Sequence, residues 1–214
     1  MDGFAHSGKD MMSIKKMQPS CRRAAHTLEN QSRQPADLGR SPTEMIINDS
    51  WFSDRHPGVT SEQVAAINAM LQAPLSSSEL TDLAKLHAKV PGGTPANEWQ
   101  IAVRNLPDSY VDLLRVSHGG CLTHGEREIA FFEDRSLREY LLHYEFPVYM
   151  PGSLPFGLNG GGVFYIFDMR EPARNGEFPI LVAHSSCLGY DDATLIAGDI
   201  HELLCGTTNV EHLM

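Results

Sequence analysis

The stretch Leu106–Gly120, LPDSYVDLLRVSHGG, says most about the fold. Pro107 suits the start of a helix, because its fixed backbone angle is helical and its missing N–H would have no partner there. Three apolar side chains then share one helix face at the i, i+3, i+4 spacing: Tyr110, Leu113 and Leu114. Gly119 and Gly120 accept the positive φ angles at which helices often end. The stretch therefore predicts a helix that packs by one face.

Upstream of this stretch, capping patterns predict a helical N-terminal extension. Thr60 with Gln63, and Ser76 with Glu79, have the spacing of capping boxes, in which each side chain satisfies a backbone N–H of the other residue. Apolar residues with helical spacing follow both boxes: Val64, Ile67 and Leu71 after the first, and Leu80, Leu83 and Leu86 after the second. We expect two consecutive amphipathic helices here.

A third helix is expected between these two and the central stretch. Thr94 can cap it, and Pro95 would occupy its first position. Trp99, Ala102 and Val103 would form its apolar face.

Downstream, the pattern changes to strands. Val163–Phe167, VFYIF, is apolar at every position, which is typical of a central strand covered on both faces. Shorter strands are expected at Glu128–Phe132, Phe178–Ala183 and Thr194–Ala197. Since this order of elements does not alternate strand and helix regularly, it predicts an α+β fold.

Two further helices are expected among the strands. Ser136 with Glu139 has the spacing of a helix cap, and so does Asp199 with Glu202 near the end of the chain. The last pair precedes Ile200, Leu203 and Leu204. The sequence therefore predicts that the chain closes with a short capped helix.

The length of 214 residues suits one folded domain with a tail. Residues 1–45 have no periodic apolar face, so we expect a disordered tail followed by a single domain over residues 46–210. No apolar stretch approaches the roughly 20 residues of a membrane span, and no secretory signal is recognisable. We therefore expect a cytoplasmic protein with reduced cysteines and no membrane association.

Charge is distributed unevenly along the chain. Residues 100–214 contain seven Lys or Arg and 16 Asp or Glu, whereas residues 1–40 contain seven and four. An acidic surface repels phosphate backbones, which argues against a nucleic-acid ligand. It suits a basic protein partner.

The segment 106–120 resembles the signature of the SUKH superfamily, the Smi/Knr-like proteins. In that signature Leu-Pro opens a helix, a Tyr and a Leu pair face the core, and an Asn-Gly-Gly turn ends it. His118 replaces the Asn here, and since both residues tolerate the left-handed conformation, we expect the turn to be kept. PFGLNGGGVFYIFDMR (155–170) and LGYDDATLIAGDIHELL (188–204) resemble later family landmarks, so the core signature spans residues 106–205.

The resemblance implies a curved antiparallel sheet packed against helices, with no catalysis and no cofactor. Many bacterial members resemble immunity proteins of toxin–antitoxin pairs, which bind and block a toxin domain such as a nuclease. Fungal relatives are regulatory binding modules. We therefore expect a non-enzymatic binding module, with a regulatory scaffold without a toxin partner as an alternative.

A metal-dependent hydrolase or a zinc-stabilised domain is a second alternative. Imidazole and thiolate are ligands that zinc prefers, and the chain spaces them similarly in two places. The candidate ligands are His118, Cys121, His124, His184 and Cys187. Against this, structural zinc sites usually contain more thiolates, and His118 already has a place at a helix end.

Candidate partner-binding residues come from predicted loops. The acidic candidates lie in glycine-containing loops: Glu126, Asp191 and Asp192. The aromatic candidates have loop residues beside them, so we expect them to be exposed: Tyr149, Phe156 and Tyr190. Exposed aromatic residues beside acids would suit binding of a basic partner.

Overall fold

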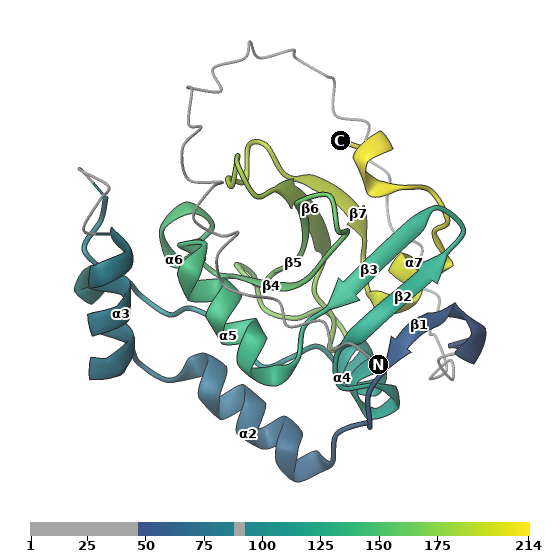
Figure 1. Cartoon of the computed structure of the whole chain (residues 1–214), viewed down its shortest axis with the longest axis horizontal. Helices are drawn as coiled ribbons and strands as arrows, with labels where there is room; N and C mark the ends of the chain where they lie inside the picture. The colour runs from purple at the N-terminus through teal and green to yellow at the C-terminus, as the bar shows by residue number, and fades with distance from the viewer. Residues whose placement is uncertain (1–46, 88–92) are drawn as a thin grey trace, which may run out of the picture. The chain divides into compact units, whose positions relative to one another are not determined.

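A computed structural model describes residues 47–87 and 93–214, so the predicted tail of residues 1–45 lies outside the described part. Seven antiparallel strands form one sheet that is not closed, and their order in the sheet is their order in the chain. Helices pack against this sheet (Figure 1). The predicted α+β class is confirmed.

The strands are Phe52–Arg55 (β1), Gly120–His124 (β2), Arg127–Phe131 (β3), Ser153–Leu158 (β4), Val163–Asp168 (β5), Ile180–His184 (β6) and Thr194–Ala197 (β7). The α-helices are Ser61–Gln72 (α2), Ser77–His87 (α3), Asp108–Val116 (α4), Asp134–His143 (α5), Phe146–Tyr149 (α6) and Ile200–Cys205 (α7). Short 3₁₀ turns cover Asp49–Trp51, Ala96–Glu98 and Val210–His212.

Strand β5 is covered on both faces, as its uniformly apolar sequence predicts. No residue from 163 to 167 is more than 1% exposed. The Phe164 ring packs edge-on against Phe146 of α6, with 5.3 Å between ring centroids. The Phe167 ring contacts Tyr110 of α4 at the same distance. Since side chains 164 and 167 point to opposite faces of the strand, helices lie on both sides of β5.

Helix α4 forms where the central stretch predicts it, directly after Pro107. Its predicted apolar face is buried, with Tyr110, Leu113 and Leu114 all at most 2% exposed. The turn that follows uses Gly119 (φ +86°) and Gly120 (φ +120°), which have no Cβ to clash at positive φ.

The turn after α4 is kept, but His118 is not left-handed, because among the described residues only Glu145 and Asn175 have positive φ besides glycines. His118 instead caps helix α5. Its Nε2 accepts a hydrogen bond from the backbone N–H of Asp134 at 3.1 Å. The predicted cap at Ser136 is wrong, since α5 begins at Asp134.

The predicted third helix does not form. Only a 3₁₀ turn at Ala96–Glu98 appears, and the chain then continues to Pro107 without helix or strand. Hydrogen bonds to distant elements replace those of a helix: Asn68 accepts from the Leu106 N–H at 2.8 Å, and Arg104 donates to the Met169 carbonyl at 2.7 Å. Contacts with the rest of the fold outweigh the local helical pattern in this segment.

The two capping boxes at α2 and α3 are both present. Thr60 and Gln63 exchange hydrogen bonds at the start of α2. Ser76 and Glu79 do the same ahead of α3. Figure 1 shows α5 between α2 and strand β4, so α2 reaches the sheet through α5.

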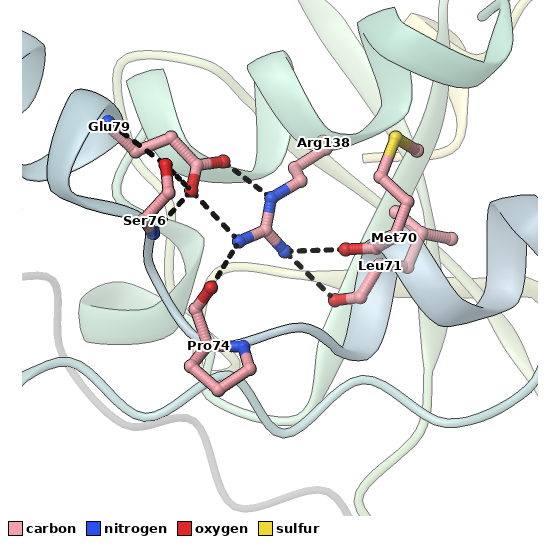
Figure 2. Close-up of polar contacts among 6 residues, drawn as sticks. All are labelled: Met70, Leu71, Pro74, Ser76, Glu79 and Arg138. Carbon is pink, nitrogen blue, oxygen red and sulfur yellow. Dashed lines mark hydrogen bonds and ion pairs between the residues drawn. The ribbon is translucent and has the colours of Figure 1, made fainter.

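Arg138 of α5 connects α2 and α3 to the rest of the fold (Figure 2). Its side chain is 7% exposed. It forms an ion pair with Glu79 at 2.6 Å and donates to the carbonyls of Met70 (2.8 Å), Leu71 (3.3 Å) and Pro74 (3.2 Å). The hydrogen bond from Arg138 lowers the pKa of Glu79 to about 2. The guanidinium therefore joins the end of α2, the loop and α3.

Arg127 of β3 plays a similar part at the end of the chain. It is 5% exposed, and it donates to the carbonyls of Leu203 (2.7 Å) and Thr208 (3.1 Å). It thereby holds the C-terminal end of α7. The N-terminal end of that helix carries the predicted cap, in which Asp199 accepts from the N–H of Glu202 at 2.8 Å.

Candidate partner-binding surface

The described residues are strongly acidic, with nine Lys or Arg against 22 Asp or Glu and thus a net charge of −13. Several of the few cations are turned inward or engaged. Arg127 and Arg138 are buried, and Arg104 donates to the Met169 and Arg170 carbonyls. The outer surface is therefore even more negative than the residue count indicates.

The turn that joins β6 to β7 is fixed through Tyr190. Its hydroxyl donates to the Pro151 carbonyl at 2.9 Å. The Arg170 guanidinium lies 3.6 Å from the centre of the Tyr190 ring and also pairs with Asp168 at 2.7 Å. Burial raises the pKa of Tyr190 to about 12, and hydrogen bonds from Arg170 lower the pKa of Asp168. These contacts hold the turn in one position.

Four of the six predicted partner-binding residues lie in the Tyr190 turn or close in sequence to Pro151, which Tyr190 contacts. Asp191 and Asp192 are exposed and follow Tyr190 directly. Tyr149, 42% exposed, lies two residues before Pro151. The Tyr190–Pro151 hydrogen bond joins the turn that carries Asp191 and Asp192 to the segment that follows Tyr149. We call Tyr149, Tyr190, Asp191 and Asp192 the Asp191 patch.

Sequence reasoning missed Arg170 and Glu171, which border this patch. Glu171 is exposed, and its charge acts on Arg170. No local pattern could have placed them there, because a complete strand and two loops separate Arg170 from Tyr190 in the chain.

Glu126 is exposed but belongs to another part of the molecule. It lies in the β2–β3 turn, where its N–H donates to the Thr207 carbonyl at 2.7 Å. Strands β3 and β4 are antiparallel, and Ala130 pairs with Leu158, at the end of β4 that is farther from Pro151. Glu126 lies beyond Ala130 on that side. Glu126 therefore lies toward the Leu158 end of β4, whereas Pro151, the acceptor of the Tyr190 hydroxyl, precedes the other end of that strand.

The expectation that Phe156 is exposed is wrong, because its side chain is fully buried. Its ring lies 5.3 Å from Tyr110 and 4.2 Å from Phe167, between centroids. The neighbours that resemble loop residues, Pro155 and Gly157, lie within β4 at a shift of its register. Phe156 is a core residue that cannot contact a partner.

The predicted zinc ligands serve separate structural contacts. His124 donates from Nδ1 to the Leu204 carbonyl at 2.8 Å, while His118 caps α5. The Nδ1 of His184 lies 2.7 Å from the Ser186 hydroxyl. The remaining two candidates are half-buried: Cys121 and Cys187. In residues 47–87 and 93–214, no three His, Cys, Asp or Glu side chains are grouped as a metal site would need.

None of the helices in the described ranges combines the length and apolar character needed to cross a bilayer. The SUKH resemblance rests on the three quoted segments and stays a prediction. Comparison with protein-family models and with curated protein sequences finds no match to this chain.

Proposed function

We propose that the chain is a cytoplasmic, non-enzymatic binding module of SUKH type, an immunity protein that binds and neutralises a basic toxin domain. The observation that carries this proposal is the Asp191 patch. It combines two carboxylates, exposed on a turn that Tyr190 and Arg170 hold in place, with the exposed Tyr149 of α6. The net charge of −13 on the described residues supports the same choice of partner.

The mechanism follows from charge and shape. A negative surface attracts a basic partner over distance and speeds the encounter, an effect that salt weakens. Tyr149 then supplies apolar area at the contact, as tyrosines often do in interfaces. Because the turn is already fixed, little conformational freedom is lost on binding. A nuclease-like toxin would be blocked when its basic substrate cleft is covered.

The test uses the product of the gene beside this one, since immunity genes sit next to the toxins they neutralise. Binding is measured at low and high salt for wild type and for the double variant Asp191→Asn/Asp192→Asn. We expect the association rate of the variant to fall roughly tenfold at low salt, with a smaller change in the dissociation rate.

The matched control is Glu126→Gln/Glu128→Gln, which removes two exposed charges from the β2–β3 hairpin. It should bind nearly as fast as wild type. Equal association rates for wild type and the Asp191 double variant would place the footprint elsewhere. A neighbouring product that neither binds nor is inhibited would overturn the immunity function and favour a regulatory scaffold.

A further inference from the structure

The open sheet has two edge strands, and they differ in how they are protected. Strand β1 carries Asp54 and Arg55, and its register shifts between Phe52 and Asp54. Arg55 also pairs with Asp49 at 2.8 Å. Charges and irregular pairing are the usual means by which natural sheets prevent a further strand from adding at an edge. Strand β1 is thus protected against the addition of a further strand.

Strand β7 lacks the charged residues of β1, although its pairing with β6 also shifts register, between Ile180 and Leu181. Its sequence, TLIA, contains no charged residue, and Leu195 is 64% exposed. Within the described ranges, the backbone hydrogen bonds of residues 194–197 go only to β6. Since alternate residues of an edge strand direct their N–H and C=O groups outward, β7 presents free donors and acceptors beside an exposed leucine.

The charges around β7 indicate what could pair with it. Residues 175–214 contain six Asp or Glu and no Lys or Arg. Asp191 and Asp192 precede the strand, and Glu202, whose carboxylate accepts from the Gly198 N–H at 2.7 Å, follows it. An extended segment lying along β7 would therefore meet exposed carboxylates at both ends. Only a segment rich in Lys or Arg complements that arrangement.

We propose that the β7 edge binds an extended basic segment of the partner protein by strand addition, with Leu195 as the apolar anchor and carboxylates at both ends of β7 as the charge contacts. This inference rests on the proposed function, because it names how the partner of the Asp191 patch is held. Backbone hydrogen bonds supply the affinity in such a contact, and side chains at alternate positions supply the selectivity.

The first experiment needs no partner. A synthetic peptide of alternating Lys and Val is titrated into the full chain, followed by calorimetry and by amide NMR shifts. We expect binding with shifts at residues 194–197. The same peptide with N-methyl groups on alternate backbone nitrogens keeps its charge but cannot complete the ladder, so its affinity should fall at least about tenfold.

The matched variants are Leu195→Lys and Leu213→Lys. Leu213 is 41% exposed and lies outside β7, so both variants add one charge at an exposed leucine. We expect Leu195→Lys to weaken peptide binding about tenfold, because a lysine on an edge opposes strand addition and repels the peptide. Leu213→Lys should have a much smaller effect. Equal effects of the two substitutions, or equal binding of the N-methylated peptide, would overturn the proposal.

The outcomes also separate this inference from the proposed function. If the neighbouring gene product binds Leu195→Lys as tightly as wild type, strand addition is wrong while the immunity function stands. If that product does not bind but the peptide binds at β7, the immunity function fails and the edge site stands. If the chain instead forms dimers that Leu195→Lys abolishes, the edge serves a second copy and the proposal is wrong.

Discussion

Two buried arginines, Arg138 and Arg127, bind carbonyl groups at helix ends through different sets of contacts. Each donates to carbonyl groups near the end of a helix, where the last carbonyls lack partners within the helix. Arg138 also pairs with the carboxylate of Glu79, whereas no ion pair of the described residues involves Arg127. One contact therefore depends on a titratable group, and the other depends on neutral carbonyls only.

Removing Arg138 should have the largest effect. Arg138→Ala leaves Glu79 and three carbonyls without their donor, and breaking a buried ion pair typically costs about 3–5 kcal/mol. Urea unfolding measures the loss. Arg135→Ala, at an exposed position of the same helix, is the control and should change little. A loss below about 1 kcal/mol for Arg138→Ala would show that the α2–α3 pair does not depend on this contact.

Acid should weaken the Arg138 region next. The pKa of Glu79 is about 2 in the folded chain and 4.5 ordinarily. Because the folded pKa is the lower one, the contribution is complete above about pH 4.5 and is lost as pH falls toward 2. Because Glu79 is partly exposed, solvent screens its charge, and the contribution stays well below the roughly 3 kcal/mol that a shift of this size would give in full. The free energy of unfolding is compared between wild type and Glu79→Gln across this range. The difference should shrink in acid, and a constant difference would contradict the assignment.

Replacing Arg127 should cost less and act locally. Arg127→Met keeps an apolar stem but removes two hydrogen bonds to carbonyls, which we expect to cost about 2 kcal/mol. Hydrogen exchange should speed up in α7 and remain unchanged in α2. The dependence on Glu79 titration should persist in this variant. If it disappears, the two arginine sites are not independent.

The smallest effect concerns Gly206, which follows α7. A Cβ at this position would overlap the Arg127 guanidinium, although its φ of −74° suits any residue. Gly206→Ala should therefore cost about 1 kcal/mol in wild type and be neutral or slightly stabilising with Arg127→Met. A double-mutant cycle measures this coupling. Equal costs in both backgrounds would show that the Arg127 side chain can move aside without lowering the free energy of unfolding.

Local patterns predicted those parts of the fold that local interactions determine. Helix α4, strand β5 and the Asp199 cap each depend on residues close in the chain, and each is confirmed. Strands β1 and β2 were not predicted, because they are short and lack a clear alternation. Strand β4 was also missed, since its Pro155 and Gly157 are unfavourable in strands, yet a register shift accommodates them.

The candidate site was only partly predictable for the same reason. Exposure of Asp191 and Asp192 follows from their turn sequence. Their proximity to Tyr149 depends on a hydrogen bond between residues 39 positions apart, which no spacing rule reveals. The burial of Phe156 depends likewise on rings contributed by α4 and β5.

The order of the strands in the sheet bears on how the chain assembles. From β2 to β7, each strand pairs with its neighbour in sequence and closes only the loop between them, whereas β1 pairs with β2 across 65 to 70 positions. The arginine contacts span similar or longer stretches of chain than the β1–β2 pairing, since Arg138 meets residues 59 to 68 positions away and Arg127 reaches residues 76 to 81 positions away. We therefore expect strands β2 to β7 to form early by successive hairpins, and the β1 pairing and the two guanidinium contacts to form last.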